Sequence, residues 1–210
     1  QELAFRLREA YPGGAIPPLR EWLDPADAAG AYAVQAINTR YWESQGRRIV
    51  GSKAGLTAEA VQKQLGVDQP DFGMLFDDMQ VADGGRLNPS RCIQPKAEAE
   101  IAFVLGTDLP SPDTTVEQVT AAVARVHAAI EIVDSRIADW KITFADTVAD
   151  NGSSAFFVLA EQGLPLGGLD LEAAQMAMTV NGKMASTGIG AAALGNPLIA
   201  AAWLARTLAK

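Results

Sequence analysis

The stretch Ala97-Glu98-Ala99-Glu100-Ile101-Ala102-Phe103-Val104-Leu105 decides how this sequence is interpreted. It follows a β-strand period, in which successive side chains face opposite sides of a sheet. Glu98 and Glu100 therefore share one face, where two like charges are costly unless a cation neutralises them. Glu131 repeats the anomaly inside the apolar run Ala129–Asp134, which predicts a second strand.

These three carboxylates predict a site for a divalent cation. The chain has one cysteine and one histidine, Cys92 and His127, which are too few for a thiolate cluster or a multi-histidine zinc site. Mg²⁺ and Mn²⁺ prefer oxygen ligands, which the glutamates supply. The alternative is that the glutamates are edge-strand charges that prevent sheets from pairing. The pattern alone leaves both interpretations open.

The composition bounds the class of protein. Of the 210 residues, 49% are hydrophobic and 20% are charged, so the chain can bury a substantial core. A net charge of −8 argues against nucleic acid and anionic membranes as partners. The apolar stretch Leu198–Ala205 is far shorter than the roughly 20 residues that span a bilayer. With a single cysteine and no leader peptide, we expect a cytoplasmic protein.

The first third of the chain is predicted to be helical. Apolar residues recur at helical spacing between residues 3 and 10 and again between Ala29 and Tyr41. Asp24 is expected to cap the second helix, which should end at Gly46. The other elements expected in residues 1–66 are a strand at 48–50 and a helix at 57–66.

The pattern then changes to strands. A helix is expected to begin at a capping box of Thr114 and Glu117 and to continue to about Ala128, so that His127 lies on it. Asn181-Gly182 predicts a two-residue hairpin turn, because both residues tolerate positive φ angles. Helices first and mixed strands afterwards indicate an α+β fold. Further predicted elements are strands at 97–105, 129–134 and 155–160 and a helix at 197–208.

Three polar segments are candidates for a functional site. Lys53 lies within Gly51–Gly55, an expected strand-to-helix junction where the backbone can approach a ligand, although a solvated lysine in a turn is the alternative. Asp77-Asp78 supplies a general base or ends a solvated loop. A third segment lines a pocket mouth or forms a plain loop, and it contains Asp146, Asp150, Asn151, Ser153 and Ser154.

Several motifs of the chain are more specific than these local patterns. They are GRRIVGSKAGLT (46–57), QLGVDQPDFG (64–73), LFDDM (75–79), PKAEAEI (95–101), AIEIVDSRI (129–137), DTVADN (146–151), LGNP (194–197) and AWLA (202–205). Together they resemble the 2-keto-4-pentenoate (2-hydroxypenta-2,4-dienoate) hydratase family of the fumarylacetoacetate hydrolase superfamily. The resemblance covers nearly the whole chain.

The resemblance implies a fold and a cofactor. The fold is a mixed β-barrel or β-roll core of the fumarylacetoacetate hydrolase type at residues 67–210, behind a helical N-terminal region at residues 1–66. The cofactor is Mg²⁺ or Mn²⁺, held by Glu98, Glu100 and Glu131. Members of the family continue past the position of Lys210 with a segment that closes the active site, so we expect the complete protein to be longer.

The resemblance also implies an activity, that of a hydro-lyase in the meta-cleavage degradation of aromatic compounds. The enzyme would add water to 2-hydroxypenta-2,4-dienoate to give 4-hydroxy-2-oxopentanoate. Lys53 and Asp78 are the implied catalytic residues. The implied substrate contacts are Leu75, Asn151, Ser153 and Ser154.

Two other functions fit the same resemblance. One is a 4-oxalocrotonate-type decarboxylase with the same dienolate-stabilising metal site. The other is a non-catalytic partner subunit, although a scaffold has no need to bury three glutamates. We expect a small-molecule substrate, a homo-oligomer, and association with the aldolase that follows in the pathway.

Overall fold

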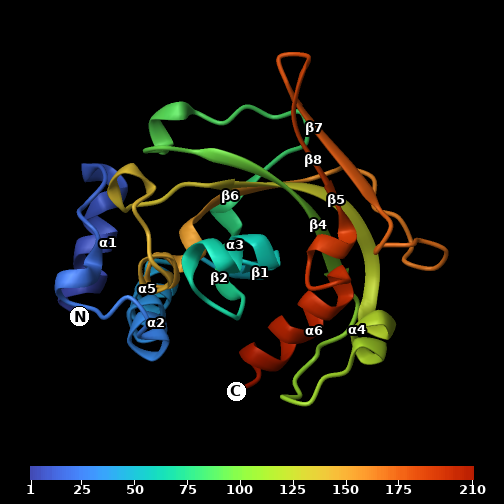
Figure 1. Cartoon of the computed structure of the whole chain (residues 1–210), viewed down its shortest axis with the longest axis horizontal. Coiled ribbons are helices and arrows are strands. Elements are labelled where there is room, and N and C mark those ends of the chain that lie inside the picture. The colour runs from blue at the N-terminus through green and yellow to red at the C-terminus, as the bar shows by residue number, and fades with distance from the viewer. The chain divides into compact units, whose positions relative to one another are not determined.

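The computed structural model describes all 210 residues, Gln1–Lys210, as a mixed α/β fold (Figure 1). The α-helices are α1 (Glu2–Gly13), α2 (Ala28–Ser44), α3 (Glu59–Leu65), α4 (Val116–Ala122), α5 (Phe144–Ala149) and α6 (Pro197–Leu208). The strands are β1 (Ile49–Gly55), β2 (Asp71–Phe76), β3 (Gln80–Val81), β4 (Lys96–Leu105), β5 (Val123–Val133), β6 (Ser154–Leu159), β7 (Gln175–Val180) and β8 (Lys183–Ile189).

The strands form three small sheets. β1 pairs with β2, β7 pairs with β8, and the largest sheet has the order β3-β6-β5-β4. None of them closes on itself, so the closed-barrel form of the predicted core is not observed. By their contacts, the residues divide into two compact units. The first unit contains residues 1–55, 71–98 and 131–158, and the second contains residues 56–70, 99–130 and 159–210.

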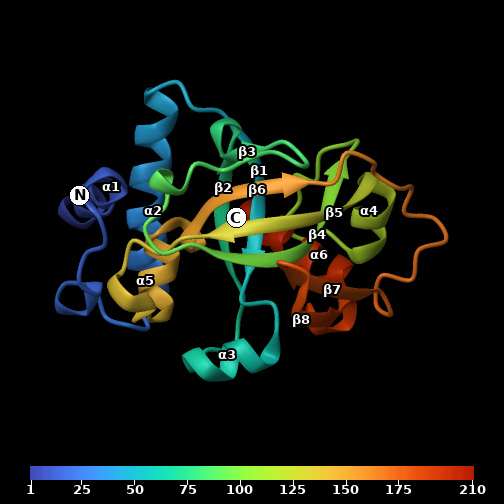
Figure 2. The ribbon, with the colours of Figure 1, turned by 90° about the horizontal axis from the view of Figure 1, so that it is seen from above.

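The helices α1, α2 and α5 pack together in the first unit (Figure 2). Their buried faces carry Leu7, Ala31 and Val148, each no more than 1% exposed. The predicted cap of α2 is wrong by three residues. Asp27 accepts a hydrogen bond from the backbone N–H of Gly30 and caps the helix, whereas Asp24 bonds within the preceding turn.

A buried ion pair joins the segment after β5 to the end of α5. Nε of Arg136 lies 2.5 Å from Oδ1 of Asp150, and both side chains are 1% exposed. The backbone N–H of Arg136 donates to Asp150 Oδ2, and its Nη2 donates to the carbonyls of Asp150 and Ser154. The guanidinium also lies 4.6 Å from the ring centre of Tyr11 in α1. Arg136 therefore ties three segments of the unit together.

The second unit confirms the predicted hairpin and C-terminal helix. Asn181 and Gly182 have φ angles of 51° and 74°, as a type I′ turn between β7 and β8 requires. α6 begins at Pro197, where the side chain of Asn196 accepts a hydrogen bond from the N–H of Leu198. Within this unit α6 packs against α4.

The prediction for residues 114–128 is partly wrong. The capping box consists of Thr115 and Gln118, one residue later than predicted. α4 ends at Ala122 and the chain continues at once as β5, so His127 lies on a strand and not on a helix. Its Nδ1 is 2.9 Å from the carbonyl of Ala160, which accounts for this histidine structurally.

Two further elements differ from prediction near the N-terminal third. β1 runs through Gly51–Gly55, so Lys53 belongs to a strand and not to a strand-to-helix junction. β2, at Asp71–Phe76, was not predicted, because its glycine and acidic residue obscure any period. None of the α-helices combines the length and the hydrophobicity that a membrane-spanning helix requires.

Arg136→Met should lower the free energy of unfolding by about 3–5 kcal/mol, because it leaves the Asp150 carboxylate buried without its partner. Replacing both residues by apolar ones should recover part of that loss. Urea denaturation measures both effects. Lys63→Ala is the control, since it breaks the exposed Lys63–Glu59 pair and should change stability little. An Arg136→Met variant as stable as the parent would contradict the importance of the pair.

Candidate functional site

One face of the β1–β2 hairpin carries the polar groups of the candidate site. In the antiparallel register Lys53 lies opposite Gly73, and Gly55 lies opposite Asp71. Paired residues project to the same face, as do residues two positions apart on one strand. Lys53, Asp71 and Leu75 therefore share a face.

The side chain of Lys53 is closely surrounded and only 13% exposed. Its Nζ lies 3.4 Å from Oε1 of Glu131. A β-carbon at Gly152 would lie 2.6 Å from Lys53 Cε, and one at Gly55 would lie 3.1 Å from Nζ. Gly152 also has a φ of 63°, which side chains other than glycine rarely adopt. These two glycines allow the backbone to hold the ammonium group beside Glu131.

Glu98, Glu100 and Glu131 bring one carboxylate oxygen each to within 4.8 Å of one another. The first two lie two residues apart on β4, and Glu131 lies on β5, the neighbour of β4 in the sheet. The predicted convergence of the three glutamates is confirmed. Their role as metal ligands stays a prediction.

This group of donors fits a hard divalent cation. It offers only carboxylate oxygens, which Mg²⁺ and Mn²⁺ prefer. Desolvation by the surrounding protein raises the pKa of Glu98, Lys53 lowers it, and the charge of Glu131 raises it again. Lys53 brings one positive charge to three carboxylates. A bound cation would neutralise the excess.

Ser154, the first residue of β6, orients one of these carboxylates. Its hydroxyl donates to Oε1 of Glu131 over 3.0 Å, and both residues are buried. The Glu131 oxygen that faces Lys53 is thus held by a second group. Ser154 was predicted to contact the substrate, and its position beside the cluster is compatible with that prediction.

Asp71 was not singled out from the sequence, yet it lies at the centre of the site. It is 1% exposed, and its Oδ1 has no hydrogen-bond partner. Burial raises its pKa, and the charge of Lys53 opposes that shift. Asp71 Oδ1 and Lys53 Nζ both crowd the position that a β-carbon at Gly55 would occupy. Asp71 is therefore a buried carboxyl with a raised pKa beside the lysine.

Asp78 lies away from Lys53. It lies in the short turn at Asp77–Met79 that follows β2. This turn begins beyond the paired residues Ile49 and Phe76, and Ile49 is roughly 13 Å along β1 from Lys53. Its Oδ1 accepts hydrogen bonds from Nε and Nη2 of Arg47 at 2.9 and 2.7 Å, and its side chain is 50% exposed. The hairpin brings Asp71 and not Asp78 beside the lysine.

The turn at Asn151–Ser153 holds two further predicted contacts. Asn151 accepts a hydrogen bond from the backbone N–H of Met74 and donates one to its carbonyl, so its amide links the turn to β2. The hydroxyl of Ser153 lies 3.3 Å from that of Thr147. All three residues of the turn are buried and have φ angles between 52° and 63°.

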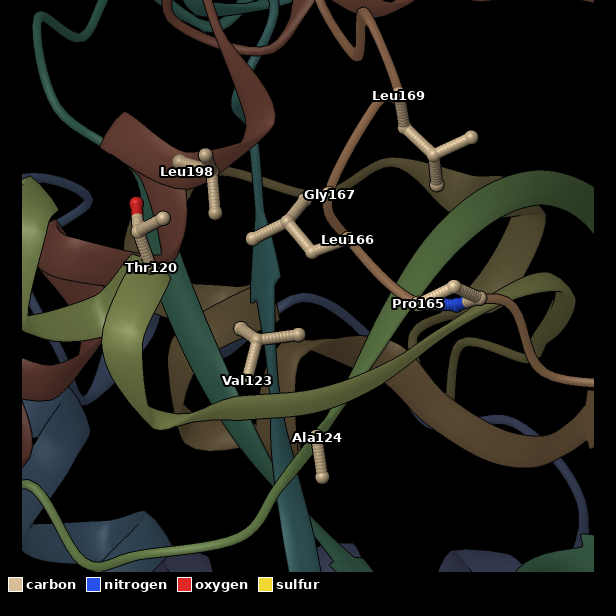
Figure 3. Close-up of a pocket in the computed structure, with 8 residues that line it drawn as sticks. All are labelled: Thr120, Val123, Ala124, Pro165, Leu166, Gly167, Leu169 and Leu198. Atoms are coloured by element: carbon tan, nitrogen blue, oxygen red, sulfur yellow. The ribbon is translucent and has the colours of Figure 1, made fainter.

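A pocket within the second unit is of a different kind (Figure 3). It encloses about 470 Å³ and carries no titratable side chain. Its lining is almost entirely apolar and consists of Thr120, Val123, Ala124, Pro165, Leu166, Gly167, Leu169 and Leu198. It cannot supply the acid–base groups that the cluster around Lys53 offers.

Comparisons with known proteins agree with the geometry. The chain is 53% identical over 204 residues to the 2-keto-4-pentenoate hydratase of Burkholderia vietnamiensis (strain G4 / LMG 22486), covering 97% of this chain and 78% of that protein. It is 54% identical over 193 residues to 2-keto-4-pentenoate hydratase 1 of Dechloromonas aromatica (strain RCB), covering 92% and 73%.

A solved structure is similar over almost the whole chain. It is 4-oxalocrotonate decarboxylase from Pseudomonas putida G7, complexed with magnesium and adipate, with a TM-score of 0.92, 36% identity, and coverage of 99% of this chain and 80% of that one. Residues 48–209 match the family model described as the fumarylacetoacetate (FAA) hydrolase C-terminal domain. The chain therefore belongs to the fumarylacetoacetate hydrolase family, among relatives of the 2-keto-4-pentenoate hydratases.

Proposed function

We propose that this protein is a divalent-metal-dependent hydro-lyase that converts 2-hydroxypenta-2,4-dienoate to 4-hydroxy-2-oxopentanoate in the meta-cleavage degradation of aromatic compounds. The observation that carries the proposal is the placement of Lys53 and Asp71 beside three converging glutamates. The hydratase relatives support the choice of substrate.

The cation is assigned to Glu98, Glu100 and Glu131. Mg²⁺ or Mn²⁺ bound there would act as a Lewis acid and stabilise negative charge on the substrate's carboxylate and 2-oxygen. The lysine adds a fixed positive charge next to the same glutamates. Lys53 is therefore placed to hold the negative charge that develops on the 2-oxygen of the substrate.

Asp71 is the proposed acid and base. Because burial raises its pKa, it can carry a proton at a pH where an exposed aspartate would have lost it. In the first step the 2-hydroxyl of the substrate releases its proton to solvent and Asp71 protonates C5, which gives a 2-oxo-3-enoate. In the second step the oxygen of water bonds to C4, and Asp71 takes the proton that this water loses. C3 takes one proton from solvent, which balances the proton released in the first step.

Asp78, which the family resemblance implies as a catalytic residue, stays a prediction, and Arg47 holds its carboxylate at the other end of the strand pair. Leu75 shares the face of Lys53 and is retained as a substrate contact. Asn151, Ser153 and Ser154 are retained as residues near the substrate, with structural bonds of their own.

The remaining parts of the proposal concern fold, assembly and location. We retain a helical N-terminal region at residues 1–66 and a β-roll core at 67–210. A homo-oligomer is supported by large apolar side chains exposed on β7 and β8, among them Val180, Met184 and Ile189. Association with the pathway aldolase and a cytoplasmic location complete the proposal, the latter supported by the single cysteine.

The direct test is hydration of 2-hydroxypenta-2,4-dienoate, followed by loss of the dienoate absorbance and by identification of 4-hydroxy-2-oxopentanoate. Activity should vanish in EDTA and return with Mg²⁺ or Mn²⁺. 4-Oxalocrotonate is the second substrate to assay. Release of CO₂ from it without hydration of the dienoate would favour the decarboxylase, the function of the similar solved structure.

Lys53→Met and Asp71→Asn should each lower kcat by about 10² or more, since each removes a charge or proton carrier at the site. Asp71→Asn should fold because it adds no charge, whereas Lys53→Met leaves the buried Glu131 carboxylate without its ion pair, so the melting temperature of each variant is measured beside its kcat. Lys63→Met is a matched control on the exposed face of α3 and should keep full activity. Near-normal turnover in Lys53→Met would return that lysine to a structural role.

Metal binding should reverse the pH dependence of stability. A carboxyl whose pKa is raised in the folded state binds its proton more tightly there than in the unfolded chain, so without metal Glu98 adds stability as the pH falls through its raised pKa. With Mg²⁺ present, protons compete with the cation for the carboxylates. The melting temperature should therefore fall as the pH is lowered through the same range, because the stabilising cation is lost.

Melting curves with EDTA and with Mg²⁺ across that pH range measure the two slopes. Glu98→Gln should weaken the response to Mg²⁺ and raise the melting temperature of the metal-free protein, because it removes one like charge. A melting temperature that Mg²⁺ does not change at any pH would exclude a metal site at these glutamates.

A further inference from the structure

A chain of buried hydroxyl groups connects Asp71 to the Arg136–Asp150 pair. The hydroxyl of Thr147 lies 3.3 Å from Asp71 Oδ2 and 3.3 Å from the hydroxyl of Ser153. Ser153 Oγ lies 3.5 Å from Asp150 Oδ2. Each residue of the chain is no more than 4% exposed.

Two hydroxyl protons serve the three contacts of this chain, so one contact is left without a proton. Thr147 donates to Asp71, and Ser153 then donates either to Thr147 or to Asp150. Asp150 already accepts hydrogen bonds from the backbone N–H and Nε of Arg136. The contact of Ser153 with it is also the longest of the three.

Asp71 lacks such partners. Its Oδ1 has no hydrogen bond, and the hydroxyl of Thr147 is the side-chain donor to its Oδ2. Since Arg136 satisfies Asp150, the hydroxyl protons are better used on Asp71, which is short of donors. Ser153 then donates to Thr147, and Thr147 donates to Asp71.

We propose that Thr147 is a positioning residue for the reaction, which holds Asp71 by Oδ2 so that Oδ1 stays directed toward Lys53 and the substrate. This inference rests on the proposed function, because it assigns Asp71 the proton transfers. Thr147 itself touches neither the substrate nor the glutamates in this role. It lies on α5, whose cap at Thr143 and Asp146 fixes the helix from the other end.

Thr147→Val tests the inference, because valine keeps the shape of threonine and removes only the hydroxyl. We expect kcat for the dienoate to fall about tenfold or more, with KM changed less than twofold, since orientation of the acid is lost and substrate binding is not. Thr147→Ser, which keeps a hydroxyl, should restore most of the loss. A purely structural role would not lower kcat while leaving KM nearly unchanged, and Thr147→Ser would not restore kcat.

Thr39→Val is the matched control, because the Thr39 hydroxyl in α2 is also buried but has no hydrogen-bond partner. It should leave kcat unchanged. If Thr147→Val does not fold, Thr147→Ala decides, because it removes the same hydroxyl and should lower kcat about tenfold or more at nearly constant KM. Unchanged kcat in the folded variant overturns the inference. An inactive parent protein, in contrast, overturns the proposed function itself.

Discussion

The buried guanidinium of Arg136 holds in place the segment on which the candidate site depends. It satisfies the Asp150 carboxylate and two backbone carbonyls at once. Between those carbonyls the chain makes a turn whose residues all have positive φ angles, a conformation that costs free energy for side chains other than glycine. This anchor, together with the two hydrogen bonds of Asn151 to Met74, offsets that cost and holds Ser154 beside Glu131.

The site concentrates negative charge where the fold would otherwise avoid it. Glu98, Glu100 and Glu131 converge, and Asp71 is buried a short distance away. Protonation of Asp71 and binding of a divalent cation are two ways to reduce this charge, and both serve the proposed chemistry. Protonated Asp71 supplies an acid, and the bound cation supplies a Lewis acid. The carboxylates that make the fold electrostatically costly are thus the same groups that the proposed reaction uses.

Local patterns predict part of this arrangement. The strand period of β4 and the Asn181-Gly182 turn are readable because each depends on neighbours in the sequence. The start of β5 at Val123 cannot be predicted in this way, because the alanines and valines there are compatible with a helix or a strand. Pairing with the neighbouring strands of the sheet determines which one forms. Asp71 cannot be identified from the sequence for a related reason. Its pairing with Gly55 in the register of β1 and β2 is what places it on the same face as Lys53.

The turn after α5 shows why the remaining part of the site depends on contacts between residues far apart in the sequence. Asn151 directs its amide to the backbone of Met74, while Gly152 packs on the side chain of Lys53. Asn151 contacts β2 and its neighbour Gly152 contacts β1, which requires a sharp turn of the chain. In this turn a β-carbon at residue 152 would collide with the side chain of Lys53. The lysine is therefore held beside Glu131 by the shape of the backbone as well as by charge.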